Sequence, residues 1–537
     1  MTEPACGTCR KKCRKCDRKR PICDRCRIRG LHCEGYPPRF QFCEVLTAPS
    51  RKKSSNVSSS SDPGTSSTVT TFGESVLESP TVPETVIAVT SSVEHSVTES
   101  LDNNLLESAE DVTQNSSISD YLSVSSPTNT QYSTTQVSFA SPLVPVPQLE
   151  NEIIANQPIM EYFERTLSQH LTVQAQGIEN PFHKYVLPLA YQHQGILHAL
   201  LGLSVCHMHI SGNESSQYFV ATSCSYRISA LHSLGSLLHK EEVSNLEPLE
   251  AEYILAIVLL LVLHDVCETG ISANGAHLTG VSFLCKRMAY PANCSTRSKA
   301  GIFFTSALSW LDMLRGFSGA EKLSYSQDIR RCVRDHGSLS LHTLVGCPAS
   351  LFYAIGSVLA AGKASLAGEL SCEKFKQVLD DAERFFRSWD PEQVIYPTGH
   401  AEWKHLAEAY RHACLLRIMR FPDPYLLSCN DPRIKESVAA ILDVCSLVPR
   451  DSVFFKRLLF PIFLAGANTS SPHQIHYAKW CISGIKTATG FQHPALTKVL
   501  ASVWNERKAN PFSLVDVCWM DFTCSEQLRS QHAYLFF

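Results

Sequence analysis

Six cysteines near the start of the chain fall into two copies of one spacing, C-x2-C-x6-C, joined by six residues. They are Cys6, Cys9, Cys16, Cys23, Cys26 and Cys33. A C-x2-C pair brings two thiolates to one metal ion from a tight turn, and a third thiolate nearby completes most of a tetrahedral shell. Two such half-sites so close together predict two metal ions.

The ligand count predicts which thiolates are shared. Two tetrahedral Zn²⁺ ions need eight sulfur contacts, whereas the repeat supplies six cysteines. Two cysteines must therefore bridge, and the symmetric choice is Cys6 and Cys23, the first of each half. The segment has little to bury besides Ile22, Ile28 and Leu31, so metal binding has to stabilise its fold. Structural zinc supplies roughly 10 to 16 kcal/mol in small modules.

The residues between these cysteines are strongly basic. Residues 1–53 contain 15 Lys and Arg against 5 Asp and Glu, whereas residues 54–537 contain 33 against 46. A compact cation of this density attracts a phosphate backbone by Coulomb steering and counterion release. We interpret the basic residues from Arg18 to Arg29, which include Arg25 and Arg27, as phosphate contacts or solvated charges. The candidate DNA-binding residues are Arg10, Lys11, Lys12, Arg14, Lys15, Arg18, Lys19 and Arg20.

Residues 6–36, CGTCRKKCRKCDRKRPICDRCRIRGLHCEGY, closely resemble the Zn2Cys6 binuclear zinc cluster of fungal transcription factors. The resemblance covers all six ligand spacings, the basic run, Asp17, Pro21 and the Gly35-Tyr36 pair. It implies a zinc-cluster domain that holds two Zn²⁺ ions and binds double-stranded DNA in the nucleus. It also implies that a short helix near Arg10 to Cys16 enters the major groove, often at CGG-type triplets.

One position departs from the family pattern. The fourth residue after the second cysteine is usually a Lys or Arg that reads guanine, and here it is Cys13. A thiol cannot make the bidentate contact to guanine O6 and N7. Base reading is then expected to shift to Lys12 or Arg14, which leaves the CGG preference open. Cys13 also forms a C-x2-C pair with Cys16 and is an alternative ligand, but we favour the six-cysteine frame because only that frame produces two equal halves.

Residues 44–150 have the composition of a long disordered linker. From residue 54 to 150 there are 12 acidic residues, no Lys or Arg, and many Ser, Thr, Val and Pro. Such a segment has too few large apolar side chains to offset the entropy of ordering it. No heptad repeat predicts a coiled coil here. The Arg51-Lys52-Lys53 run is typical of a nuclear import signal.

One stretch of this linker has helical spacing amid acidic residues, from Leu101 to Val112. It admits two interpretations. The first is an activation motif that folds on a coactivator, and the second, which we favour, is an ordinary disordered stretch that contains leucines.

Residues 151–537 show the apolar spacing of a large all-α domain, with no alternation typical of strands. The most apolar run, Ile254–Leu263, is too short to span a bilayer and predicts a core helix, so no membrane is expected. Loops are expected at 318–327, 391–399, 422–432 and 469–472. Helices are expected at 160–167, 196–203, 216–240, 247–267, 303–317, 348–368, 374–388, 402–420, 434–446, 453–465, 473–488 and 496–506.

This region is similar to the fungal-specific transcription factor domain, an all-helical regulatory region found behind the zinc cluster. The family tryptophan that commonly precedes the His-Leu-x-Gly motif is absent, since residues 272–275 stand there instead. The similarity rests on the order of short motifs, which are Asn180-Pro181-Phe182, Leu187-Pro188-Leu189, Leu197 to Ser204, His277 to Gly280 and Gly346-Cys347-Pro348.

The helical region carries no catalytic motif that the sequence makes recognisable. Gly270-x4-Gly275 is followed by Ala276-His277 rather than Lys-Ser/Thr, so it is not a phosphate loop. No G-x-S-x-G elbow or H-E-x-x-H motif occurs, and we therefore expect no enzyme. The group of His193, His198, His207 and His209 lacks the spacing of a metal site on one helical face. Four cysteines in apolar stretches are interpreted as buried thiols: Cys206, Cys267, Cys285 and Cys414.

Two functions from different classes remain. The first is a sequence-specific transcription factor for RNA polymerase II genes, with a zinc cluster at 1–43, a linker at 44–150 and a regulatory domain at 151–537. A metabolic or biosynthetic gene set is one suggestion for its targets, and its partners are expected to be coactivators or corepressors. The second is a thiol- or metal-responsive cytosolic sensor that binds nucleic acid incidentally. The sequence leaves open whether the chain forms a homodimer, and also the role of Cys43.

Overall fold

The computed structural model describes two parts of the chain, the cysteine-rich head and the C-terminal body. The described residues are 6, 8–9, 12, 14–17, 23–33, 146–212, 217–244, 246–272, 280, 298–510, 516–523 and 533–534. The linker up to residue 145 lies outside them, and with it the leucine-containing stretch at 101–112 and the basic run at 51–53. The motif at 277–280 lies outside them apart from Gly280.

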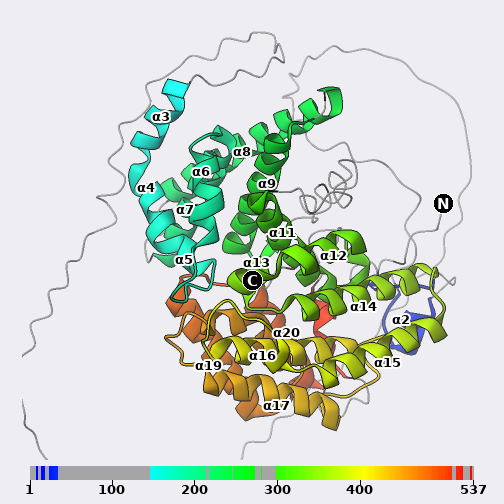
Figure 1. Ribbon diagram of the computed structural model, residues 1–537. Helices are drawn as coiled ribbons and strands as arrows, with labels where there is room; N and C mark the ends of the chain where they lie inside the picture. The colour runs from blue at the N-terminus through cyan, green and yellow to red at the C-terminus, as the bar shows by residue number, and fades with distance from the viewer. Residues whose placement is uncertain are drawn as a thin grey trace, which may run out of the picture. The chain divides into compact units, whose positions relative to one another are not determined.

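The body is built almost entirely of helices, as predicted (Figure 1). In the described residues, the strands β1 (Ile271–Ser272) and β2 (Ala533–Tyr534) form one antiparallel pair. The helices are α3 (Val146–Ala155), α4 (Gln157–Tyr162), η2 (Phe163–Leu167), α5 (Ser168–His170), η3 (Phe182–Val186), α6 (Leu187–Ala190), α7 (Gln194–Ser211), α8 (Gln217–Ser244), α9 (Pro248–Glu268), α11 (Lys299–Ser318), η6 (Ala320–Lys322), α12 (Gln327–His336), α13 (Ser338–Val345), α14 (Ala349–Ala367), α15 (Cys372–Ser388), η7 (Pro391–Gln393), α16 (Glu402–Ile418), α17 (Pro432–Leu447), η8 (Phe455–Leu458), α18 (Leu459–Ala467), α19 (Pro472–Thr489), α20 (Pro494–Ala509) and η9 (Trp519–Phe522).

The helix α9 contains the most apolar run of the sequence, and all of Ile254–Leu263 is buried, as predicted for a core helix. Its start is defined by a capping box, in which the Glu250 side chain accepts from the Glu247 backbone amide and the Glu247 side chain accepts in return. Pro248 stands at the first helical position, where its missing N–H removes no intrahelical bond. The helices α7 and α8 pack against α9 and bury its apolar surface.

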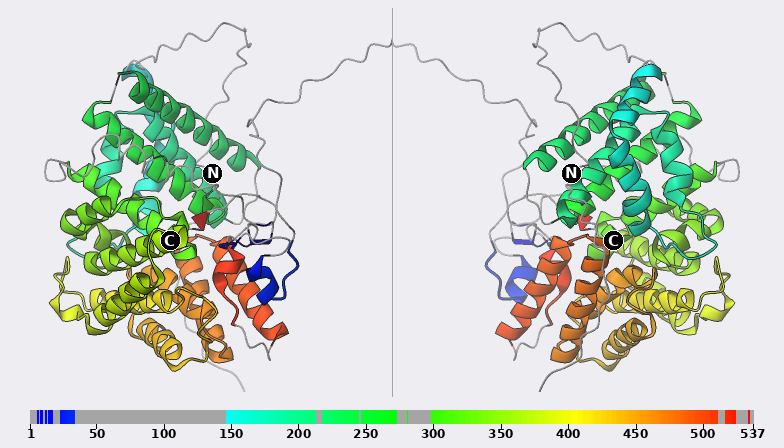
Figure 2. Two further views of the ribbon diagram at one scale, coloured as in Figure 1. Left: turned by 90° about the vertical axis from the view of Figure 1, so that its right-hand side faces the viewer. Right: turned by 90° about the vertical axis from the view of Figure 1, so that its left-hand side faces the viewer.

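The body has two ends that are joined by α11. Figure 2 shows α3 to α9 at one end and α15 to α20 at the other. The helix α11 packs against α9, α12, α13 and α14, and nearly all its residues are buried. Aromatic rings continue this core toward the second end, since Phe317 of α11 meets Phe460 of α18 edge-on at 4.9 Å between ring centroids.

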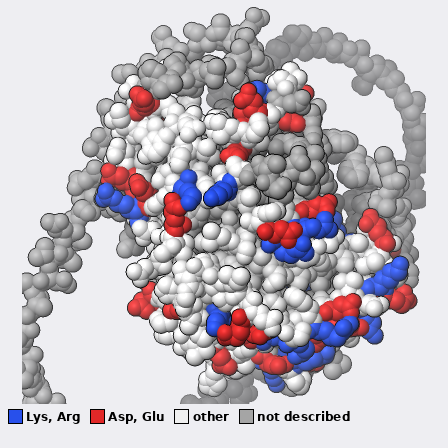
Figure 3. All heavy atoms as spheres, viewed as in Figure 1, with Lys and Arg blue, Asp and Glu red and all other residues white. Residues whose placement is uncertain are grey.

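Among the described residues, α14 is the one helix whose length and apolarity would suffice to cross a bilayer. It packs against α12, α15 and α16, and its buried residues include Leu351, Phe352 and Ile355. Length and composition of this kind also occur in the core helices of soluble domains. Figure 3 shows that charged side chains are sparse over the centre of this face and gather along its lower edge, where α15 and α17 carry ion pairs such as Arg387 with Glu383 and Glu436.

Several helices lie outside the predicted helical ranges, among them α3, α12 and α13. The helix α3 begins at Val146, so the predicted linker boundary at residue 150 falls inside it. The helices α12 and α13 lie where no helix was expected. In α12 the Ser326 side chain accepts from the Ile329 amide and caps the helix, a signal that the sequence carries. Its buried residues are Ile329, Arg330, Cys332 and Val333, which lie on one helical face, but the helix is only 10 residues long and one of these four positions is a charged residue.

Candidate zinc centre and nucleic-acid interface

The six cysteine sulfurs of the head gather into two groups of four. One group is Cys6, Cys9, Cys16 and Cys23, and the other is Cys6, Cys23, Cys26 and Cys33, with all sulfurs of a group within 4.8 Å of one another. The groups share Cys6 and Cys23, the pair that the ligand count predicted as bridging.

The sulfur spacings fit zinc. The Sγ atoms lie 3.6 Å apart for Cys6 and Cys23, 3.8 Å for Cys6 and Cys26, and 3.6 Å for Cys9 and Cys23. A tetrahedron with Zn–S bonds of about 2.3 Å has edges of about 3.8 Å. The same distances are far longer than a disulfide bond of about 2.05 Å. The donor set therefore suits two Zn²⁺ ions that share two thiolates.

The two halves of the head are built by the same backbone pattern. In each C-x2-C turn the second cysteine amide donates to the first cysteine sulfur, from Cys9 to Cys6 at 3.3 Å and from Cys26 to Cys23 at 3.4 Å. The second turn opens the short helix α2 (Asp24–Ile28), with Cys23 as its N-cap. Asp17 joins the halves, since its carboxylate accepts from the Asp24 amide at 3.1 Å.

The core of the head consists of the sulfurs themselves. Its buried members are Cys6, Cys9, Cys16, Cys23 and Cys26, with Leu31 and Cys33 packed against them. Burial raises the pKa of the Cys6 and Cys23 thiols, because a thiolate without a cation is poorly solvated there. Bound zinc supplies the positive charge that lets these groups be thiolates, and the six cysteines would hold it.

Three of the eight predicted DNA-binding residues are described. Lys15 is exposed, Lys12 is half-buried, and Arg14 is 13% exposed with its Nε donating to Asp521 at 2.8 Å. The other five, Arg10, Lys11, Arg18, Lys19 and Arg20, lie outside the described residues, as does Cys13. The structure therefore leaves the base-reading role of the first half as a prediction.

Arg25, Arg27 and Arg29 do not share one environment. Arg27 is 69% exposed and pairs with Asp24 of its own helix at 2.6 Å. Arg25 and Arg29 instead contact Tyr425 of the body. Sequence reasoning missed Tyr425 and its neighbours Asp423 and Asp521, since no motif links positions some 400 to 500 residues apart.

The histidines singled out in the sequence do not converge on a metal site. His207 is buried between the Tyr162 hydroxyl at 2.8 Å and the Thr489 carbonyl at 2.9 Å. His198 pairs with Glu152 at 2.5 Å. Within the described part of the chain, the two cysteine groups are the sets of ligand atoms that lie together.

The thiols that were predicted to be buried are buried where the structure describes them. Cys206, Cys267 and Cys414 are free and buried, and Cys285 lies outside the described residues. Burial raises the pKa of Cys267 and Cys414, which keeps both as inert thiols.

Comparison with known proteins gives a family match for the head and another for the body. Residues 158–537 match the fungal specific transcription factor domain, and residues 4–42 match the fungal Zn(2)-Cys(6) binuclear cluster domain. Two curated relatives, transcription factor phomR' and transcription factor phomR of Diaporthe leptostromiformis, are each 49% identical over 41 residues, which is 8% of this chain. The chain covers 6% of the length of these relatives. No solved structure matches the chain. Because the first match covers most of the chain and the second covers the six cysteines, the protein belongs to the fungal zinc-cluster transcription factors, with a binuclear zinc cluster before an all-helical domain.

Proposed function

We propose that this protein is a sequence-specific DNA-binding regulator of RNA polymerase II genes that acts in the nucleus. The observation that carries the proposal is the pair of four-sulfur groups that share Cys6 and Cys23 inside a segment of strong positive charge. Such a centre fixes the basic side chains around it, so they meet a phosphate backbone without a large ordering cost.

The basic residues of the head have two roles in this proposal. Most make phosphate contacts, which position the head on DNA but read no sequence. Lys12 and Arg14, on either side of Cys13, are the residues proposed to reach base edges. The two Zn²⁺ ions supply folding free energy and charge neutralisation for the thiolates, and no chemical reaction is assigned to them.

The helical domain is proposed to regulate the head rather than to catalyse a reaction. Its family match is to transcription factor domains, and two of its buried histidines, His207 and His198, form hydrogen bonds with Tyr162 and Glu152. Coactivators or corepressors are its proposed partners, and a second copy of the chain is one further candidate. A thiol- or metal-responsive cytosolic sensor is not favoured, because both family matches are to transcription factors.

The test is selection of duplexes from a random pool by the full-length, zinc-loaded protein. We expect enrichment of one sequence class and a much lower affinity for scrambled duplexes. Cys23→Ala removes a thiolate from both sulfur groups and should abolish binding. Cys224→Ala, at an exposed cysteine of α8, is the matched control and should bind as the wild type does. Equal affinity for all duplexes would contradict sequence-specific recognition.

A further inference from the structure

Three arginines of the zinc cluster are engaged by the helical domain. Arg14, Arg25 and Arg29 are 13%, 16% and 19% exposed, whereas Arg27 on the same cluster is 69% exposed. The three buried guanidinium groups therefore share one side of the cluster, and they contact three residues of the body, Asp423, Tyr425 and Asp521.

The contacts form one continuous network. Arg14 Nε donates to Asp521 Oδ1 at 2.8 Å, and Arg25 Nη2 lies 3.7 Å from the same oxygen. Arg25 also donates to the Tyr425 hydroxyl at 3.0 Å, and this hydroxyl donates to Asp521 Oδ2 at 2.5 Å. One carboxylate and one phenol thus hold two cluster arginines.

Arg29 completes the network on the face of the same tyrosine. Its guanidinium carbon lies 3.4 Å from the centroid of the Tyr425 ring, a cation–π contact, and its Nη2 lies 3.3 Å from Asp423 Oδ1. Planar stacking together with a carboxylate contact is a mode of recognition that favours arginine over lysine.

The surface of the body that contacts the cluster is held in place by one residue of the body, Arg420. Arg420, which is 2% exposed, donates to the Pro424 and Leu427 carbonyls at 3.0 and 2.6 Å and to Asp516 at 2.8 Å. Arg420 thereby links two segments of the body. One is the loop between α16 and α17, which contains Asp423 and Tyr425. The other leads into η9, the helix that contains Asp521. The surface is preorganised, so little ordering is needed when the cluster docks.

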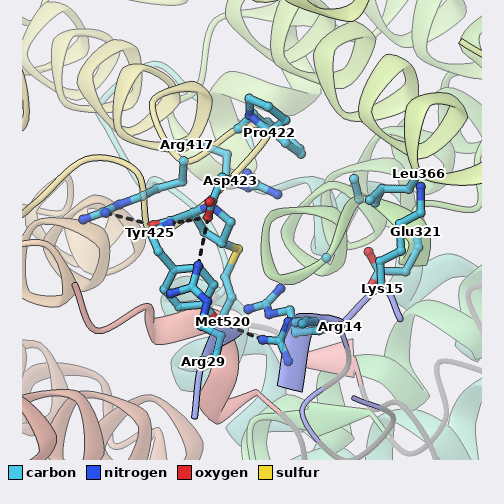
Figure 4. A pocket seen from close by; sticks show the side chains of 16 residues that line it. Arg14, Lys15, Arg29, Glu321, Leu366, Arg417, Pro422, Asp423, Tyr425 and Met520 are labelled. Atoms are coloured by element: carbon cyan, nitrogen blue, oxygen red, sulfur yellow. Dashed lines mark hydrogen bonds and ion pairs between the residues drawn. The ribbon is translucent and has the colours of Figure 1, made fainter. Parts of the chain in front are cut away.

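The contact region between the cluster and the body is not fully packed, and positive charges outnumber negative charges along it. A cavity of about 300 Å³ lies there, and Figure 4 shows Arg14, Arg29 and Tyr425 on one side with Lys15 and Glu321 on the other. Its lining holds six cations, Arg14, Lys15, Arg25, Arg29, Arg417 and Arg420, against the carboxylates of Glu321 and Asp423. Asp521 and Asp516, which do not line the cavity, pair with Arg14 and Arg420 and leave an excess of positive charge. Arg417 Nη1 is buried there without a hydrogen-bond partner. Cations facing cations weaken the docked state and make it reversible.

We propose that the surface formed by Asp423, Tyr425 and Asp521 is a docking site for the arginine side of the zinc cluster, and that DNA competes with it for the same arginines. The proposal rests on DNA binding by the cluster, as proposed above. Carboxylates and phosphates compete for one guanidinium, and the docked Arg14, which donates to Asp521 and is 13% exposed, is not open to a phosphate or a base edge. In the docked form these arginines are therefore not available to DNA. The apparent affinity of the whole chain for DNA is lowered according to the fraction of molecules in which the cluster is docked.

The test measures the affinity of full-length, zinc-loaded variants for the selected duplex at one fixed salt concentration. Asp521→Asn and Tyr425→Phe should each tighten binding on the order of tenfold, since each removes charge-assisted hydrogen bonds to cluster arginines. Asp443→Asn, at an exposed carboxylate of α17 outside this network, loses the same charge as Asp521→Asn and should leave the affinity unchanged. Unchanged thermal melting would show that the variants keep the fold of the body.

A second readout needs no DNA. The rate of zinc transfer to a coloured chelator should rise in Asp521→Asn, because an undocked cluster is open to attack, and stay at the wild-type value in Asp443→Asn. Equal DNA affinity and equal zinc transfer in Asp521→Asn and wild type would overturn the docking proposal. An equal gain in affinity in Asp443→Asn would overturn it too, as a general charge effect. If no duplex is selected by any variant, the proposed DNA recognition fails, and zinc transfer alone then decides whether the cluster docks.

Discussion

At the scale of single residues, Cys13 is the position where this cluster departs from the family pattern. If it replaces the guanine-reading Lys or Arg, Cys13→Lys should raise the affinity for CGG-containing duplexes by roughly 1 to 3 kcal/mol, the range for one good base contact. The measurement is a titration of matched CGG and scrambled duplexes with the variant and the wild type. No gain in affinity, together with the loss of one zinc by mass spectrometry, would instead identify Cys13 as a ligand.

His207 illustrates how burial sets a pH dependence. It is 1% exposed, and burial lowers its pKa to about 4, below the unfolded value of about 6.5. The folded state therefore binds fewer protons, so its contribution is fully present above about pH 6.5 and is lost as the pH falls toward 4. The total loss is on the order of 3 kcal/mol.

The corresponding measurement follows thermal melting of the body between pH 7 and 4. In His207→Gln the stability should fall less steeply as the pH decreases, because the substitution removes one group that becomes protonated on unfolding. The change in slope should correspond to at most one proton. His232→Gln, at an exposed histidine of α8, is the control and should keep the wild-type slope. An identical slope in His207→Gln and wild type would contradict the assignment of this proton to His207.

The candidate site could be predicted from the sequence only where residues lie close together along the chain. The spacing of Cys6 through Cys33 and the count of ligands led to two zinc ions and to Cys6 and Cys23 as the bridging pair, and the sulfurs lie in those two groups. The contact of Arg14 with Asp521 could not be predicted. It depends on how a folded body presents one carboxylate, which no spacing in the sequence indicates.

At the scale of elements, two helical glycines should respond to alanine in opposite ways. Alanine is favoured over glycine in a helix by about 1 kcal/mol. At Gly235 of α8 an added Cβ would meet nothing within 4 Å, so Gly235→Ala should stabilise the body by about 0.5 to 1 kcal/mol. At Gly356 of α14 the Cβ would lie 2.6 Å from Arg330 Cδ and 2.8 Å from Met313 Cε, both in buried side chains.

Overpacking of this kind costs about 1 to 3 kcal/mol, which exceeds the gain in helix propensity. Gly356→Ala should therefore lower the free energy of unfolding by roughly 1 kcal/mol. Urea unfolding of the two variants, followed by circular dichroism, provides the comparison. A stabilised Gly356→Ala would mean that α12 and α14 can separate at this crossing without cost.

The sequence predicted helices best where one apolar face is long. The run Ile254–Leu263 and the amphipathic stretch at 374–388 both lie in helices, α9 and α15. The prediction missed α12 and α13 because short helices receive most of their stability from tertiary packing rather than from their own sequence. In α12 one of the buried residues is Arg330, which donates to the Tyr325 carbonyl at 2.5 Å. In a pattern of apolar and polar residues, a buried arginine counts as polar and therefore interrupts the apolar face.

At the scale of the whole molecule, the head and the body are stabilised by different means. The body buries long apolar helices around α9 and α11, whereas the core of the head is made of cysteine sulfurs. Structural zinc contributes roughly 10 to 16 kcal/mol to small modules of this kind, which is as large as the roughly 5 to 15 kcal/mol that typically separates a folded from an unfolded domain. The head should therefore depend on metal completely, and the body not at all.

Removal of zinc by a strong chelator tests this separation in the full-length protein. We expect DNA binding to disappear and the head to become sensitive to protease, since the sulfurs, which lie within 4.8 Å of one another in each group, lose the metal bonds that hold them together. The thermal melting of the helical body should shift little, because the contacts that the described residues of the cluster make with it lie at the surface around Asp423, Tyr425 and Asp521. Return of zinc should restore binding without a refolding step for the body. Parallel loss of helical signal and DNA binding on chelation would show instead that the cluster is part of the body's own fold.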